Sequence, residues 1–154
     1  MNYLVNFFGN SKKEVYSPRE DVVNRINEIK DGTYKSKNSL DLISFICTGN
    51  SAAQTSNYTI DTFLDQNMKK TDSFEPGEIF IARNNQYGGS VVYVGVIAEV
   101  DGVKKMLTQV VNGSNPKIRT EDFNIAKKRS NQGYGTNNVT LEAYVPMDSL
   151  TLVA

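Results

Sequence analysis

The sequence predicts an α+β domain in which helices come first and an antiparallel sheet follows. In the first half, apolar residues recur at helical spacing behind capping signals. In the second half, runs rich in β-branched residues are separated by turn signals, of which Asp101-Gly102 is a two-residue hairpin signal. The chain of 154 residues fits one domain with a real core. We therefore expect residues 1–154 to form a single α+β domain.

Three helices are expected in the first half of the chain. The capping sequence at 17–20 combines a serine cap, a proline suited to the first helical position and a glutamate that completes a capping box. A second helix over 40–48 has its cap at 38–39 and its stop at Gly49. This helix is apolar on most sides, so it should be buried. Thr59 caps a third helix.

The second half is expected to form a meander of strands with polar loops between them. The basic cluster at 127–129 lies among polar residues, so we interpret it as a solvated loop rather than a phosphate-binding patch. Residues 130–138 contain two glycines and are expected to form a flexible loop. The expected strands are Glu78–Arg83, Val91–Val100, Val103–Val111, Lys117–Arg119 and Val139–Val145.

Composition excludes several classes of catalytic and binding site. The chain has no histidine, so Ser-His-Asp and Cys-His machinery and histidine metal sites cannot be built. Its one cysteine, Cys47, excludes an intramolecular disulfide and any site with several cysteines. The formal net charge is zero, which does not mark a general nucleic-acid binder. We expect no metal and no cofactor.

The sequence contains no recognisable targeting or membrane segment. Residues 1–10 are too short and too polar for a secretory signal, and no cationic region precedes them. No apolar stretch approaches the roughly 20 residues of a membrane span. We expect a soluble chain that is cytoplasmic or exported by a route that needs no classical signal.

Three short motifs occur in an order found in a known family. They are Leu40-Asp41-Leu42-Ile43-Ser44-Phe45-Ile46 at the start of the buried helix, Pro76-Gly77-Glu78-Ile79-Phe80 leading into a strand, and Tyr93-Val94-Gly95-Val96-Ile97. Over residues 17–146 the chain resembles the NlpC family of papain-like cell-wall cysteine peptidases. In that family the corresponding motifs are of the types Asp-Cys-Ser-Gly-Phe-Val, Pro-Gly-Asp and His-Val-Gly-Ile-Tyr. The resemblance implies a papain-like NlpC-type fold.

The same resemblance implies that catalytic activity has been lost. Leu42 stands where the family has its nucleophilic cysteine, and Tyr93 stands where it has its histidine base. The third, orienting residue falls near Thr108 or Gln109. Leucine has no nucleophilic atom, and tyrosine, with a pKa near 10, is a poor base at neutral pH. Cys47 lies near the end of the helix, where the macrodipole disfavours a thiolate, so we expect it in the core.

Aromatic and amide side chains provide the candidates for binding. Tyr87 and Tyr134 lie on glycine-bearing loops, and Tyr93 and Gln109 lie at the implied cleft. Residues 91, 93, 95 and 97 are expected on one face of their strand, with Gly95 leaving room beside Tyr93. Either Tyr93 and Leu42 plug the cleft, or the cleft survives as a pocket.

We expect a catalytically inactive NlpC-like domain that acts as a binding or assembly module. Its partner would be peptidoglycan or a protein, for example in a phage tail, a secretion apparatus or a cell-wall complex. The alternative is an active cell-wall amidase or peptidase that uses a non-standard constellation such as Cys47. A third possibility is a structural subunit that has no pocket.

Overall fold

The computed structural model confirms a mixed α+β fold. It describes residues 3–5, 13–16, 20–51, 58–112, 115–132, 138–147 and 150–153. The helices in these ranges are α1 (Glu20–Lys30), α2 (Ser39–Thr48), α3 (Ile60–Asn67), α4 (Phe123–Gln132) and the short 3₁₀ helix η1 (Asn85–Tyr87). The strands are β1 (Tyr3–Val5), β2 (Lys13–Tyr16), β3 (Met68–Lys70), β4 (Ile79–Asn84), β5 (Ser90–Val100), β6 (Val103–Asn112), β7 (Asn115–Asp122), β8 (Val139–Pro146) and β9 (Leu150–Val153).

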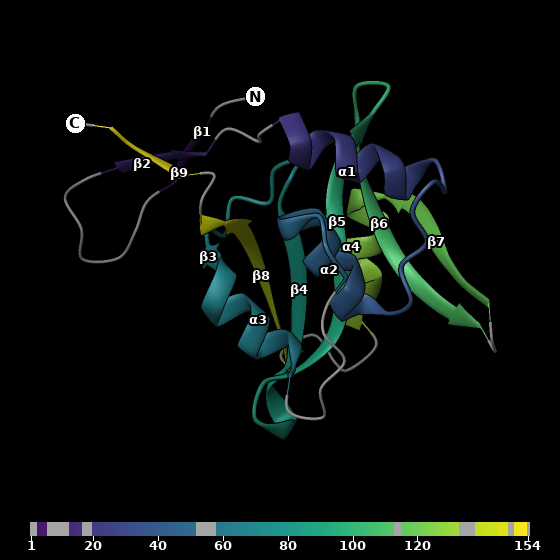
Figure 1. Ribbon diagram of the computed structural model, residues 1–154. Helices are drawn as coiled ribbons and strands as arrows, with labels where there is room; N and C mark the ends of the chain where they lie inside the picture. Colours follow the sequence, from purple (N-terminus) through teal and green to yellow (C-terminus); the bar gives the residue numbers. More distant parts are fainter. Residues whose placement is uncertain are drawn as a thin grey trace.

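A six-stranded antiparallel sheet organises the molecule (Figure 1). Its strand order is β3-β8-β4-β5-β6-β7, so β4 to β7 form a meander and β8 returns to pair with β4. The β5–β6 hairpin turns at Asp101 and Gly102, and both have positive φ (52° and 77°), as the two central residues of a type I′ turn require. A second sheet, β1-β2-β9, pairs the two terminal parts of the chain.

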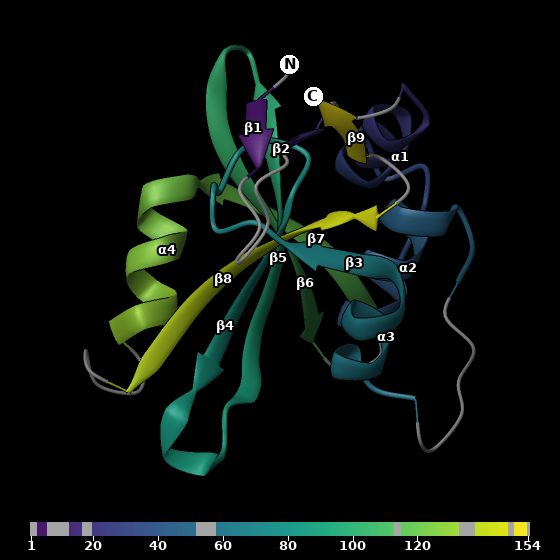
Figure 2. The same ribbon diagram turned by 90° about the vertical axis from the view of Figure 1, so that its left-hand side faces the viewer.

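Helices cover both faces of the six-stranded sheet. Figure 2 shows α1, α2 and α3 on one side of it and α4 on the other. Alternation along β4 divides the core in the same way, because neighbouring side chains of a strand point to opposite faces. Ile79 and Ile81 join a cluster with the buried side chains of α1, α2 and α3, whereas Phe80 and Ala82 join a cluster with Phe123 of α4. We call these two sides the helix-1–3 face and the α4 face.

Helix α2 is the buried helix that the sequence predicts. The Asn38 side chain accepts a hydrogen bond from the backbone N–H of Asp41, and Gly49 ends the helix at a φ of 83°, which suits glycine. The guanidinium of Arg25 in α1 donates to the carbonyls of Ile46 and Cys47, both at 3.2 Å. Arg25 therefore caps the carboxyl end of α2 from a neighbouring helix.

Several expectations about local structure are wrong. The basic cluster at 127–129, expected in a loop, and residues 130–132 of the expected flexible loop belong to helix α4, in which Lys127 lies 5.4 Å from the ring centroid of Phe74. Residues 133–137 of that expected loop lie outside the described residues. The strand expected over 117–119 is β7, which is longer in both directions, and strand β3 is not predicted by the sequence. The predicted helix start at 17–19 lies outside the described residues.

The ends of the other predicted elements agree with the structure to within one or two residues. Helix α3 follows a Thr59 cap, whose hydroxyl accepts from the backbone N–H of Thr62 at 3.2 Å. Strands β4, β5, β6 and β8 occupy the expected positions. Within the described residues, no helix is long and apolar enough to cross a membrane.

Candidate functional site

The structure does not bring Leu42 and Tyr93 together. Leu42 is fully buried and packs in the core cluster of the helix-1–3 face. Tyr93 packs with the cluster of the α4 face, where its ring meets Phe80 edge-on at a centroid distance of 5.7 Å. Because the sheet separates the two side chains, they neither plug one cleft nor form one pocket. The two alternatives that the sequence leaves open therefore do not describe a shared site.

A β-bulge in β5 places Val91 and Tyr93 on opposite faces of the sheet. Tyr93 pairs with Ala82 and Val91 pairs with Arg83, so Val92 is an extra residue in β5. Val91 packs against the cluster of the helix-1–3 face, whereas Tyr93 packs against the other cluster. The expectation that 91, 93, 95 and 97 share one face is therefore wrong at its first member.

Tyr93 is held in a polar contact rather than presented to an open cleft. Its hydroxyl lies 2.6 Å from the Thr108 hydroxyl, and burial raises the pKa of its phenol above 10.0 despite the opposing effect of that hydrogen bond. Gly95 does not leave room beside it, because a Cβ at Gly95 would lie 2.5 Å from the sulfur of Met106. The Met106 side chain fills that space.

Gln109 lies on the helix-1–3 face, at the wall of a cavity of about 320 Å³. In Figure 1 the link between α1 and α2 passes beside β6 and β7, and residues of this link line the cavity. The Ser36 hydroxyl of the link donates to the Gln109 side-chain carbonyl. The lining residues are Ile29, Lys30, Asp31, Gly32, Tyr34, Lys35, Ser36, Gln109, Lys117 and Ile118.

The Gln109 cavity combines buried polar groups with a cationic rim. Ser36 is 2% exposed and Gln109 is 8% exposed, so both polar side chains form the inner wall. The Gln109 side-chain nitrogen donates to the Lys117 carbonyl at 3.4 Å, which uses one of its two N–H groups. Lys30 and Lys35 are exposed and make no ion pair within the described residues. The cavity thus offers donors and positive charge.

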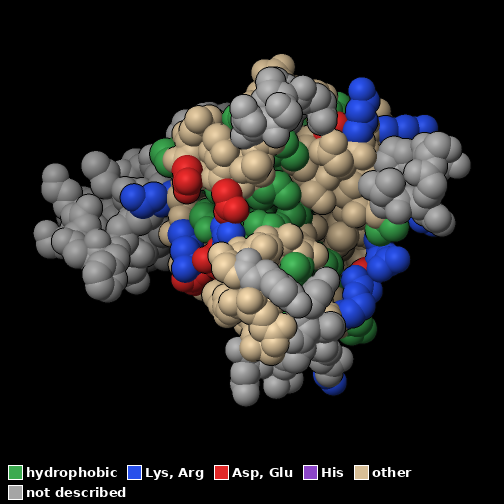
Figure 3. All heavy atoms as spheres, turned by 90° about the horizontal axis from the view of Figure 1, so that it is seen from below, with side chains coloured by type: hydrophobic (Ala, Val, Ile, Leu, Met, Phe, Trp, Pro, Cys, Tyr) green, Lys and Arg blue, Asp and Glu red, His purple; other side chains and the backbone are tan. Residues whose placement is uncertain are grey.

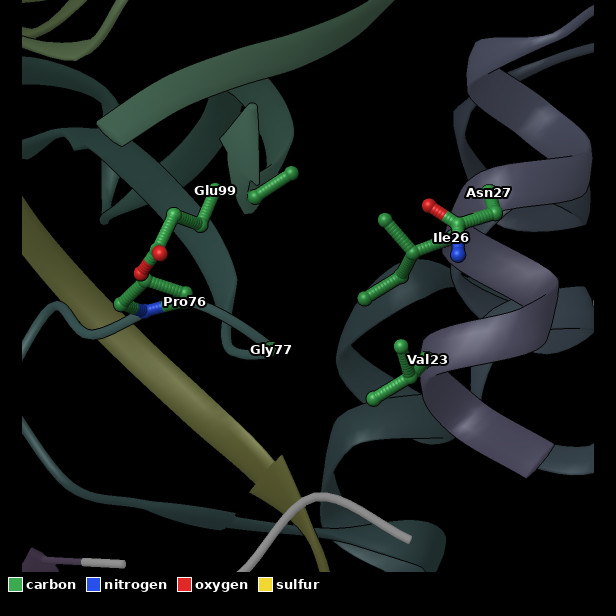
Figure 4. Close-up of a pocket in the computed structure, with 7 residues that line it drawn as sticks. Val23, Ile26, Asn27, Pro76, Gly77 and Glu99 are labelled. Carbon is green, nitrogen blue, oxygen red and sulfur yellow. The ribbon is translucent and has the colours of Figure 1, made fainter. Parts of the chain in front are cut away.

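A second cavity, of about 190 Å³, lies between α1, the turn at Pro76 and Gly77, and β5 (Figure 4). Val23 and Ile26 point from α1 towards the side on which Pro76 and Glu99 lie. Its polar side chains, Asn27 and Glu99, are both exposed. This cavity has no buried polar side chain that could orient a ligand, so the Gln109 cavity is the better candidate site.

Cys47 is 6% exposed and belongs to the core of the helix-1–3 face. It lies in the last turn of α2, where the helix dipole disfavours an anion and where Arg25 bonds two backbone carbonyls. The geometry therefore gives Cys47 the role of a core residue.

Charged residues of α3, β3, β4 and β8 form a cluster. Figure 3 shows the molecule from below, with hydrophobic side chains near the centre of the view and acidic and basic ones beside them. Arg83 lies 2.6 Å from the Asp61 carboxylate and donates to Glu142 at 2.7 Å, and Glu142 also accepts from Tyr144 and contacts Lys70 at 3.3 Å. Every carboxylate of this cluster has a cationic partner, so the cluster ties α3 to the sheet.

The electrostatics of this cluster shift two pKa values. Burial acts to raise the pKa of Glu142, but hydrogen bonds from Arg83, Tyr144 and Lys70 outweigh it and hold that pKa below 4.5. Burial, with the hydrogen bond to Glu142, raises the pKa of Tyr144 to about 12. The cluster is therefore most stable with Glu142 ionised and Tyr144 neutral.

None of the other binding candidates from the sequence is among the described residues that line the Gln109 cavity. Tyr87 ends η1, and its side chain is not among the described ones. Tyr134 lies outside the described residues. Thr108 belongs to the α4 face with Tyr93. Among the described residues, no group of three or more cysteine, aspartate or glutamate side chains could hold a metal ion.

Sequence reasoning found Gln109 but missed the rest of its cavity. Ser36 lies 73 residues from Gln109 in the chain, and Lys30 and Lys35 are part of a polar helix end and link that carry no motif. Only the fold brings these groups together. Comparisons with known proteins give no match: no family model, no curated protein and no solved structure is significantly similar to the chain.

Proposed function

We propose that this chain is a catalytically inactive binding module and that the Gln109 cavity is its binding site. The observation that carries the proposal is the pair of buried polar side chains, Ser36 and Gln109, at the wall of an open cavity. Two lysines at its rim have no ion pair among the described residues. Buried polar groups converging on a cavity are typical of binding sites. The partner is a protein or a peptidoglycan fragment, both of which present peptide groups.

The placement of the residues at the family's catalytic positions, and of the cysteine, supports a binding role rather than a catalytic one. Leu42 is fully buried, the Tyr93 hydroxyl is engaged by Thr108 on the other face, and Cys47 is in the core. A nucleophile and its base must lie within hydrogen-bond reach of each other. Leu42, Tyr93 and Cys47 form no such pair with one another.

The relationship to the NlpC-type family is part of the proposal. It is supported by the order and spacing of three short motifs, by the buried helix that opens with the first motif, and by the strand that follows the Pro76-Gly77 turn. The proposed relationship covers only the order of the motifs and of the helices and strands, and it does not include the family's active site. The family's cleft cannot be placed between Leu42 and Tyr93 because the sheet lies between them.

The test combines a binding assay with a hydrolysis assay on purified peptidoglycan and its soluble fragments. We expect the protein to cosediment with peptidoglycan without releasing products, and Lys35→Glu to weaken the binding. The matched control is Lys128→Glu, which makes the same charge change at an exposed position on α4, across the sheet. Product release abolished by a single substitution, such as Cys47→Ser, would show an enzyme and end the proposal.

A protein partner is the outcome if peptidoglycan is not bound. The discriminating measurement is then the response of a purified partner complex to the same two variants. Loss of the complex with Lys35→Glu, but not with Lys128→Glu, supports the Gln109 cavity as the site. Equal behaviour of the two variants assigns the binding to another surface.

A further inference from the structure

We propose that the Gln109 cavity takes a carboxylate attached to a small apolar group. This inference rests on the proposed function, because it names the ligand chemistry of the same site. It follows from three properties of the cavity: its spare hydrogen-bond donor, the charge of its rim, and its apolar walls.

The spare donor points to a ligand with an acceptor oxygen. The Gln109 side-chain carbonyl accepts from Ser36, and one of its two N–H groups is directed to the Lys117 carbonyl. The second N–H has no partner within the described residues, although the side chain is only 8% exposed. A buried N–H without a hydrogen-bond partner is destabilising. A ligand oxygen that accepts from it removes this cost, so the cavity favours a ligand that brings an acceptor.

The charge of the rim favours an anion. The rim has two lysines, Lys30 and Lys35, and one carboxylate, Asp31, so its net charge is positive. None of the three has an ion pair within the described residues. Strand alternation directs the Lys117 side chain away from the face on which Ile118 packs, so Lys117 contributes its carbonyl rather than its charge. The carboxyl end of α1 does not repel an anion strongly, because backbone N–H groups of Asp31 and Gly32 already bond its last carbonyls.

The walls add an apolar surface of limited size. Ile29 is 1% exposed, and Tyr34 and Ile118 are half-buried beside it. The Tyr34 ring is stacked on Phe45 at a centroid distance of 3.7 Å, so this wall is fixed. A volume of about 320 Å³ accommodates a group of the size of a leucine residue with its carboxylate. A carboxyl-terminal peptide end and a free branched-chain acid share this chemistry.

The experiment is a titration of the ¹⁵N-labelled protein followed by NMR. The three probes are N-acetyl-L-leucine, its carboxamide N-acetyl-L-leucinamide, and 4-methylpentanoate, which has the same carbon skeleton without the acetamido group. We expect N-acetyl-L-leucine to shift the side-chain NH₂ signal of Gln109 and the amides of Ser36 and Lys35. The carboxamide, which lacks the charge, should bind at least about tenfold more weakly.

Variants separate a specific site from general charge attraction. Lys35→Glu should weaken the binding of N-acetyl-L-leucine about tenfold, and Gln109→Leu should weaken it as well, whereas Lys128→Glu should leave it unchanged. Should Gln109→Leu fail to fold, Lys35→Glu still decides, because residue 35 is exposed in a link. Equal binding of acid and carboxamide, or equal binding by the Lys35→Glu and Lys128→Glu variants, overturns the inference.

The three probes also identify the source of the carboxylate. Together with the variants they distinguish failure of the carboxylate inference from failure of the proposed function. Tighter binding of N-acetyl-L-leucine than of 4-methylpentanoate indicates a peptide end, and similar binding indicates a free acid. If neither carboxylate binds but Lys35→Glu still weakens the binding of peptidoglycan or a protein partner, the carboxylate inference is wrong while the binding module stands. If peptidoglycan is hydrolysed, the proposed function fails whatever the titration shows.

Discussion

Gly95 in β5 provides the sharpest test of the side-chain packing on the α4 face. We predict that Gly95→Ala destabilises the protein. The new Cβ would lie 2.5 Å from the sulfur and 2.9 Å from the Cγ of Met106, whereas non-bonded carbon contacts are optimal at about 3.5–4.0 Å. Met106 is fully buried beside Phe80 and Phe123, so it cannot move away without displacing its neighbours.

The magnitude follows from the cost of overpacking a well-filled core. One extra carbon at such a site costs about 1–3 kcal/mol. For a chain of this length, each kcal/mol lowers the midpoint of thermal unfolding by about 2–4 °C. The sign is informative in itself, because Gly→Ala without a clash stabilises a protein by about 0.4–1 kcal/mol through the unfolded state.

The assay is urea and thermal unfolding of four proteins followed by circular dichroism. They are the wild type, Gly95→Ala, Met106→Ala and the double variant. Met106→Ala alone leaves a cavity and should cost about 2–5 kcal/mol. In the double variant the alanine at 95 enters that cavity, so its loss should be smaller than the sum of the single losses by about 1 kcal/mol or more. A Gly95→Ala variant as stable as the wild type would mean that the space beside Tyr93 is open.

Two further predictions concern side chains that hold the helices and the sheet together. Arg25→Ala should lower the unfolding free energy by about 1–2 kcal/mol, because it removes the cap on the carboxyl end of α2; in urea unfolding Arg25→Lys should lie between it and the wild type. Glu142→Gln should cost about 1–2 kcal/mol at neutral pH, because Arg83 and Tyr144 lose a charged partner. Since the folded pKa of Glu142 lies below 4.5, its stabilisation is present above the unfolded pKa and is lost as pH falls through the folded pKa. The difference between variant and wild type should therefore shrink in acid, and a constant difference would contradict this reasoning.

Helices with a capping residue, a glycine stop and an apolar face can be predicted from the sequence. Helix α2 has a cap at Asn38, a stop at Gly49 and an apolar body, and each signal lies within the helix or next to it. The sequence does not predict helix α4 because only two of its described apolar side chains, Phe123 and Ala126, are buried, whereas Ile125 is exposed and the other residues are polar. Two anchors set no recognisable period, so this helix depends on contacts with the sheet.

The sequence does not reveal which face of a strand the helices cover. Alternation correctly groups Tyr93 with Gly95 and Ile97, but the choice of face depends on packing between distant segments. The same limit applies to the candidate site. Gln109 could be singled out by resemblance, whereas Ser36 and the lysines reach it only through the path of the link between α1 and α2.

The register of β5 explains how a family-like order of motifs can coexist with separated positions. Tyr93 pairs with Ala82 in the regular part of the ladder, so strand alternation directs it towards α4, while its neighbour Val94 packs on the face that α2 covers. The bulge at Val92 lies beyond this regular stretch and returns only Val91 to the helix-1–3 face. A catalytic pair at positions 42 and 93 would require residue 93 on the same face as Val94. The pairing register, in addition to the loss of cysteine and histidine, therefore separates those two positions, and among the described candidates Gln109 is the one that borders the cavity on the helix-1–3 face.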